Sequence, residues 1–169
     1  VDFDERMYAA GKIPGGYLKR EGKPSEKAIL TSRVIDRPIR PLFPKDLRND
    51  VALTLTVMSV DPECRPELVA MLGSAIATSI SDIPFCGPCA TTQIGLVDGA
   101  FIVNPNQEQW KNGDLQLTVA STSEKVIMIE AGANEVPEAK MIEAIYMAHD
   151  VNQTLIAWIN DIVKEVGKA

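Results

Sequence analysis

The sequence lacks any apolar run long enough to cross a bilayer. A membrane-spanning helix needs about 20 consecutive apolar residues, and no such run occurs among the 169 residues. A signal-peptide pattern is missing as well. The chain begins at Val1 rather than Met, so we expect a fragment whose N-terminus is missing, and the lack of a targeting segment carries little weight. We expect no membrane partner.

Cysteine and histidine are also scarce. Three cysteines are an odd and low number, which favours a reducing compartment. A zinc site needs about four ligands. Apart from Cys86 and Cys89, only Cys64 and His149 remain to complete a zinc site, and neither spacing matches a known zinc finger. The single histidine, His149, has no identifiable catalytic partner, so no Ser–His–Asp or Cys–His grouping is predicted.

The tetrapeptide CGPC, Cys86 to Cys89, spells the thioredoxin redox pair. That chemistry needs the first cysteine at the N-terminus of a helix, where the dipole lowers the thiol pKa. Here the tetrapeptide leads into the strand-like segment ATTQIGLV. We interpret the two residues as thiols beside a turn. The glycine-rich phosphate-binding motifs GxxxxGK[ST] and GxGxxG are absent too.

The residues that are present indicate one soluble globular domain. Apolar residues make up 46% and charged residues 24% of the chain. The net charge of −6 is unevenly placed, because residues 1–48 carry 11 Lys/Arg against 7 Asp/Glu and residues 49–169 carry 6 against 16. A polyanionic partner is therefore expected only for the N-terminal third.

Hydrophobic periodicity and turn residues predict an α+β fold whose sheet is built mainly from hairpins. Pro38 should end or kink the first helix, and an extended segment should follow it. Asp98-Gly99 should form the turn of a hairpin. In chain order, the predicted elements are a strand end at 6–10, a loop at 12–24, a helix at 25–37, a buried strand at 51–60, a helix from Pro66, hairpins at 90–105 and 114–132, and helices at 137–148 and 151–166.

Arginines cluster in and after the first predicted helix. Arg33 and Arg37 are four residues apart and share a helical face, and Arg40 continues the line if the helix persists beyond Pro38. One interpretation is a solvated or salt-bridged face, with Asp36 as a partner. The other is that the guanidinium groups bind phosphates, which suit their fork geometry.

The preceding loop, GGYLKREGKPSE, adds to the second interpretation. Its glycines permit exposure, Tyr17 offers a ring on which a base can stack, and Lys19, Arg20 and Lys23 can neutralise phosphates. Single-stranded nucleic acid is bound in this way without sequence readout.

The segments AAGKIPGGYLKREGKPSE and SRVIDRPIRPLFP closely resemble the polynucleotide phosphorylase family. The resemblance continues through ELVAMLGSAIATSISDIPF and VDGAFIVNP, so residues 1–169 are identified as the first of two RNase PH-type core domains. It implies a ribosomal protein S5 domain 2-like core, a mixed sheet with helices packed on it. The opening strands should precede Val1. An all-helical segment, the second core domain, and KH and S1 domains should follow the chain.

The resemblance also implies an activity. Family members degrade RNA from the 3′ end with inorganic phosphate, release nucleoside diphosphates, and can run in reverse as polymerases. They use Mg²⁺ or Mn²⁺, form a trimeric ring around a channel, and act on single-stranded RNA. Further implied partners are an RNA helicase and an endonuclease of a degradation complex, and the implied location is the bacterial cytoplasm, with an organelle source left open.

Within the family, the opening loop forms a constriction in the channel, with two aromatic residues followed by two arginines. The corresponding residues here are Tyr17, Leu18, Lys19 and Arg20, and Leu18 departs from the pattern by losing an aromatic ring. The resemblance places Arg33, Arg37 and Arg40 toward the channel. The implied RNA-binding residues are Tyr17, Leu18, Lys19, Arg20, Lys23, Arg33, Arg37 and Arg40.

Aligned onto the family's catalytic second core domain, this chain lacks the catalytic groups. Arg65, Pro66 and Glu67 replace the phosphate-binding serines, Trp110 and Gln116 replace the two carboxylates, and Thr118 replaces the lysine. We therefore expect a non-catalytic domain that builds the ring and guides RNA. One alternative is a purely structural oligomerisation domain, and another is a domain with phosphorolysis of its own.

Overall fold

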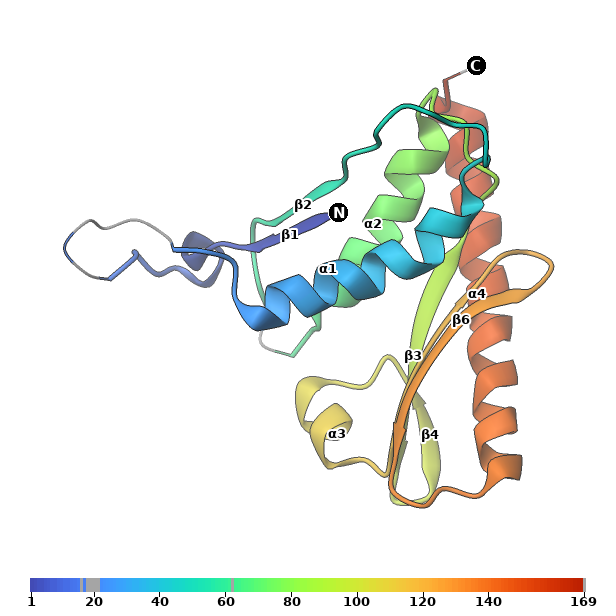
Figure 1. The fold of residues 1–169 in the computed structure, drawn as a ribbon. Coiled ribbons are helices and arrows are strands. Elements are labelled where there is room, and N and C mark those ends of the chain that lie inside the picture. The colour runs from blue at the N-terminus through green and yellow to red at the C-terminus, as the bar shows by residue number, and fades with distance from the viewer. Residues whose placement is uncertain (16, 18–21, 62, 169) are drawn as a thin grey trace.

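The computed structural model describes residues 1–15, 17, 22–61 and 63–168, and it has the predicted α+β architecture. A small parallel sheet pairs β1 (Asp2–Glu5) with β2 (Thr54–Val57). A larger antiparallel sheet has the strand order β4-β3-β5-β6. Figure 1 shows the small sheet beside α1 and the larger sheet flanked by the long C-terminal helix.

The larger sheet consists of the two predicted hairpins. β3 (Ala90–Val97) and β4 (Ala100–Val103) meet at Asp98 and Gly99, whose φ angles of 50° and 78° match the turn that favours Asp-Gly. β5 (Leu115–Ser121) and β6 (Val126–Ala133) form the second hairpin. β3 also pairs with β5, so the two hairpins form one continuous sheet.

One face of this sheet is buried under a single helix, α4 (Glu138–Val166). The prediction of two helices was wrong. No glycine or proline interrupts the segment, and Ala144, Ala148 and Asn152 continue one buried face across the predicted gap. Although α4 has 29 residues, no helix within the described ranges is both long and apolar enough to span a membrane. The apolar residues of this layer are Ile94, Leu96, Leu115, Leu117, Val119, Ala144 and Ala148.

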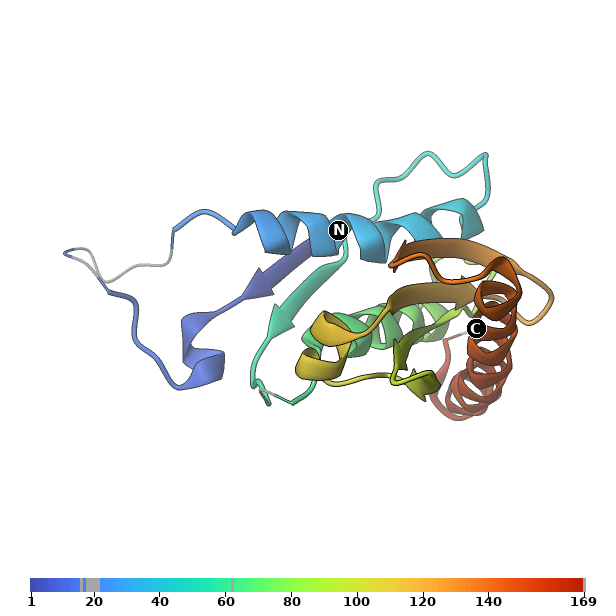
Figure 2. The same cartoon turned by 90° about the horizontal axis from the view of Figure 1, so that it is seen from below.

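A second core lies between α1 (Glu26–Ile39), α2 (Pro66–Ile80) and the small sheet, and the end of α4 reaches it at Ile159. Figure 2 shows α1 running along the small sheet. The predicted helix starts are confirmed. Ser25 Oγ accepts a hydrogen bond from Ala28 N, and Pro66 occupies the first turn of α2.

Two predictions within the first 60 residues were wrong. Residues 7–10 form a 3₁₀ turn, η1 (Met7–Ala10), which Gly11 closes with a φ of 67°, and the strand lies before it. The segment 51–60 is not a buried strand, because only Thr54–Val57 pair and Thr54 and Thr56 are exposed while Leu55 packs on the core.

The end of α1 also differs from the prediction. Pro38 lies inside the helix near its C-terminus, and its fully buried ring contributes to the core. Helical geometry continues through Arg40, whose N–H donates to Asp36 O. The expected extended segment instead opens with a 3₁₀ turn, η2 (Arg40–Leu42).

A short helix, α3 (Gln107–Asn112), was not predicted. Asn106 and Gln109 form a reciprocal capping box, with Gln109 N donating to Asn106 Oδ1 at 2.8 Å. This single helical turn brings Trp110 beside the sheet.

The fully buried Asn152 links α4 to the sheet. Thr92 Oγ1 donates to its Oδ1 at 2.7 Å, and its Nδ2 donates to Val119 O at 3.1 Å and Ser121 Oγ at 2.8 Å. All of these atoms are satisfied inside an otherwise apolar layer, so they fix the position of α4 on the sheet.

We predict that Asn152→Leu lowers the free energy of unfolding by about 1–3 kcal/mol, because the buried hydroxyls of Thr92 and Ser121 lose the amide that they bond. Urea denaturation followed by circular dichroism measures this loss. Thr154→Ala, an exposed change on the same helix, should stay within about 0.5 kcal/mol. Equal losses for the two variants would contradict the role given to Asn152.

Candidate functional site

The outer face of α1 carries the predicted arginine cluster. Arg33, Arg37 and Arg40 are all exposed. Because Arg40 has helical φ and ψ values of −53° and −46°, the line of charges extends past Pro38.

The three arginines differ in their partners. Arg40 binds Asp36 tightly, with Nη2 at 2.6 Å and Nε at 2.8 Å from Oδ2. Arg37 Nη1 lies 3.4 Å from Oε2 of Glu130 on β6. Arg33 forms no ion pair with any residue that the structure describes. The salt-bridged interpretation is thus confirmed for Arg40 and Arg37, whereas Arg33 has no ion pair among the described residues.

The loop before α1 extends away from both sheets, as the segments 12–15 and 22–25 show in Figures 1 and 2. Tyr17 is fully exposed and Lys23 is exposed, so both are accessible to a ligand. The predicted site residues Leu18, Lys19 and Arg20 lie outside the described residues.

A cleft of about 620 Å³ lies between α1, the start of α2, α3 and the larger sheet. The sheet contributes the face that points away from α4, where Gln93 pairs with Thr118 and Gln116 lies two residues along β5. Gln93 Nε2 donates to Thr118 Oγ1 at 3.2 Å, and Gln116 Nε2 donates to Trp110 O at 2.7 Å. The floor of the cleft is therefore polar.

Charged groups from the two helices line the same cleft. The guanidinium carbon of Arg65 lies 4.2 Å from the centre of the Trp110 ring, a cation–π contact. Glu67 is buried, and its Oε1 lies 3.3 Å from Lys27 Nζ and 3.8 Å from Arg65 Nη2. Lys27 Nζ also lies 3.3 Å from Glu5 Oε1, so one lysine joins β1, α1 and α2.

These contacts shift two pKa values. Burial alone would lower the pKa of Lys27, but the carboxylates of Glu67 and Glu5 outweigh burial and raise it. For Arg65, burial lowers the pKa and Glu67 only partly offsets it. The Glu67 carboxylate therefore stabilises the charged forms of both side chains.

Five of the six residues aligned with catalytic positions converge in this cleft. They are Arg65, Glu67, Trp110, Gln116 and Thr118. Of the other lining residues, Lys27 and Gln93 make polar contacts with members of this group, and sequence reasoning missed both. No motif identifies them, because their position depends on how α1 packs over the sheet.

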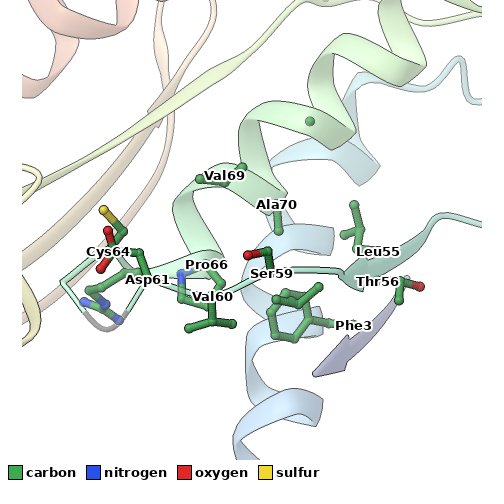
Figure 3. Close-up of a pocket in the computed structure, with 13 residues that line it drawn as sticks. Phe3, Leu55, Thr56, Ser59, Val60, Asp61, Cys64, Pro66, Val69 and Ala70 are labelled. Carbon is green, nitrogen blue, oxygen red and sulfur yellow. The ribbon is translucent and has the colours of Figure 1, made fainter. Parts of the chain in front are cut away.

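A second cavity, of about 460 Å³, has a mainly apolar lining. Figure 3 shows its side chains, which come from β1, β2, the segment after β2 and the first turns of α2. Phe3, Leu55, Val69 and Ala70 provide apolar surface. Thr56, Ser59, Asp61 and Arg65 add polar groups to this lining.

The CGPC segment does not open a helix. It precedes β3, as the sequence predicts. Cys64 and Cys86 are exposed, whereas Cys89 is buried, and burial raises the pKa of its thiol to about 12. A thiol with so high a pKa is a poor nucleophile at neutral pH.

Comparison with known proteins assigns the family. The model of the 3′ exoribonuclease family, domain 1, matches residues 1–84, and that of domain 2 matches residues 87–151. The chain belongs to the 3′ exoribonuclease family. Within this family it is similar to proteins named polyribonucleotide nucleotidyltransferase, which confirms the resemblance drawn from its N-terminal segments.

Two of these relatives are bacterial. The protein of Lachnoclostridium phytofermentans is 69% identical over 99% of this chain, and that of Clostridioides difficile is 60% identical over 99%. The chain spans 24% of the length of each relative. Among solved structures, rice (Oryza sativa) Rrp46 superimposes with a TM-score of 0.65 at 12% identity, covering 85% of this chain and 67% of that one. This match confirms the RNase PH-type fold.

The cleft does not fit the divalent metal that the family resemblance implies. Mg²⁺ and Mn²⁺ prefer carboxylate and other oxygen ligands, but the buried carboxylate of the cleft, Glu67, already faces the cations Lys27 and Arg65. Glu26 and Glu130 also line the cleft, but both are exposed. No group of three His, Cys, Asp or Glu side chains gathers among the described residues. No catalytic step through a metal is therefore derived for this chain.

We predict that a thiol reagent such as DTNB reacts with two of the three cysteines in the folded chain at pH 8. Cys64 and Cys86 should react within minutes. Cys89 should react only after unfolding in denaturant, because it is buried and only about one molecule in 10⁴ carries the thiolate at this pH. Cys89→Ser should leave the fast phase unchanged. Rapid reaction of all three thiols would contradict the burial of Cys89.

Proposed function

We propose that this chain is the first core domain of a phosphate-dependent 3′-to-5′ exoribonuclease. In this proposal the longer protein degrades single-stranded RNA to nucleoside diphosphates and can also polymerise them. The proposal is supported by the two family models and by relatives that carry the name polyribonucleotide nucleotidyltransferase. Inorganic phosphate is then a co-substrate, and the metal site lies outside this chain.

The role of this domain is to build a trimeric ring and to guide RNA, without catalysis of its own. The observation that carries the guiding role is the exposed guanidinium of Arg33, which forms no ion pair with any described residue on a face that also presents Arg37 and Arg40. Tyr17 and Lys23 extend this surface along the loop. Leu18, Lys19 and Arg20 belong to the same proposal on sequence grounds.

The lack of catalysis is supported by the composition of the cleft. Phosphorolysis needs groups that hold phosphate and a metal. Trp110, Gln116 and Thr118 supply neither a carboxylate nor a cation, and the guanidinium of Arg65 is engaged with Trp110 and Glu67. The helicase and endonuclease partners remain predictions from the resemblance.

A purely structural role is the second candidate, and the apolar side chains on α1 favour it. Ile29 and Leu30 are 46% and 60% exposed beside the arginines. Such side chains are common at subunit contacts. If α1 serves only such a contact, substitution of its arginines changes the sedimentation coefficient before it changes RNA affinity.

We predict that Arg33→Ala in the full-length protein weakens binding of single-stranded RNA and reduces the slope of log K against log[salt] by about 0.7, the value for one lost phosphate contact. Arg40→Ala should change both quantities less, because Asp36 already neutralises Arg40. Fluorescence anisotropy with a labelled oligonucleotide at several salt concentrations measures both.

Arg48→Ala is the matched control, an exposed arginine in the same third of the chain but outside the proposed surface. It should leave the salt slope unchanged. If Arg33→Ala behaves like this control while the protein still sediments as the native assembly, the guiding role is wrong. A shift in assembly mass without a change in slope supports the structural role instead.

A further inference from the structure

Lys27 lies at the base of the guiding loop, residues 12–24. It is in the first turn of α1, two residues after the N-cap Ser25. Its Nζ lies 3.3 Å from Oε1 of Glu5, the last residue of β1, and 3.3 Å from Oε1 of Glu67 on α2. One side chain therefore joins the strand that precedes the loop, the helix that follows it, and a second helix.

The pair with Glu67 is the firmer of the two contacts. Glu67 is buried and belongs to a helix of the second core, so its charge is screened less by salt than that of a surface residue. Glu5 is more exposed, and its pair with Lys27 contributes less. Arg65 also faces Glu67, with Nη2 at 3.8 Å from Oε1. The buried carboxylate therefore keeps one cation beside it when Lys27 is replaced.

The other end of the guiding loop is held by the backbone. η1 leads into the loop, and Val60 N donates to Ala9 O at 3.2 Å, which ties η1 to the segment after β2. The segments 14–15 and 22–25 line one cleft of about 390 Å³ together with β1, so both ends of the loop lie near this strand. At the end that returns into α1, the contacts to β1 and α2 are the ion pairs of Lys27.

We propose that Lys27 is a positioning residue for the guiding loop. Held by Glu67 and Glu5, it fixes the returning end of the loop and so the direction in which Tyr17 and Lys23 are presented to RNA. A loop that is already held in its binding direction loses less conformational entropy when a ligand binds. This inference rests on the proposed guiding role of the domain.

The first test needs no RNA. In α1, Ala28 N donates to Ser25 Oγ at 3.1 Å and Ile29 N donates to Ser25 O at 3.0 Å. In the full-length protein, Lys27→Met should speed hydrogen exchange of these two amides at least about tenfold, because the first turn opens more often. Exchange in α4 should stay unchanged, and Lys27→Arg should restore the native rates. Native exchange rates in Lys27→Met would overturn the proposal.

The second test separates positioning from direct contact with RNA, since the Lys27 side chain is 60% exposed. Lys27→Met should weaken binding of a single-stranded oligonucleotide about three- to tenfold, because the loop must then be ordered on binding. The slope of log K against log[salt] should stay at its native value. A slope reduced by about 0.7 would reveal a lost phosphate contact and would overturn the positioning role.

The sign of the change in Glu67→Gln is a third readout. Removing a negative charge tightens binding of a polyanion if only the electrostatic field matters, whereas loss of positioning weakens it. Glu130→Gln is the matched control, because Glu130 lines the same cleft as Glu67 but pairs with Arg37. This control should bind RNA more tightly. Tighter binding in Glu67→Gln as well would contradict the proposal.

Comparison with Arg33→Ala distinguishes this inference from the proposed function. If Arg33→Ala weakens RNA binding and Lys27→Met does not, the positioning role is wrong and the guiding role stands. If neither variant weakens RNA binding although exchange at the start of α1 rises, the guiding role itself is wrong and the positioning role falls with it.

Discussion

The alternation of side chains along β3 and β5 constrains the rest of the structure. Ile94 pairs with Leu117, and both face α4, so the register places Gln93 and Thr118 on the opposite face. A shift by one residue would bury these polar groups under the apolar helix and expose the core. Asn152 also fixes α4 on the sheet. Gln93 and Thr118 therefore lie on the face that α1 and α2 cover.

The polar face could have remained open to water, as one face of an antiparallel sheet often does. Here α1, α2 and α3 cover it. The charged side chains that line the cleft therefore need oppositely charged partners within it. Glu67 is buried with one oxygen facing Lys27 and Arg65, and Lys27 reaches on to Glu5. The same contacts that compensate this carboxylate connect the small sheet to the helices, so the cleft is part of the framework that joins the two cores.

Local chemistry predicted the elements that depend on neighbouring residues. Asp98-Gly99 indicated its hairpin and Ser25 the start of α1, because turns and caps are formed by adjacent groups. The predicted helix break near His149 was wrong, because packing on the sheet overrides local preference there. The predicted end of α1 at Arg37 was wrong, because the burial of Pro38 does the same. Most of the cleft was found by family resemblance. Lys27 and Gln93, which make polar contacts with members of this group, could not be found, because only tertiary packing brings them to the other five.

The arginine face shows why residues of the same type on one helical face do not carry equivalent charges. From sequence, Arg33, Arg37 and Arg40 are three equivalent charges on a basic segment. In the structure, Asp36 and Glu130 neutralise two of them, so the local field is close to that of one cation. A polyanion approaching this face meets Arg33 first and has to displace a carboxylate to reach either neighbour. In the proposed guiding role, such a surface would attract RNA weakly at each step, which suits a polymer that must slide past it rather than stay bound.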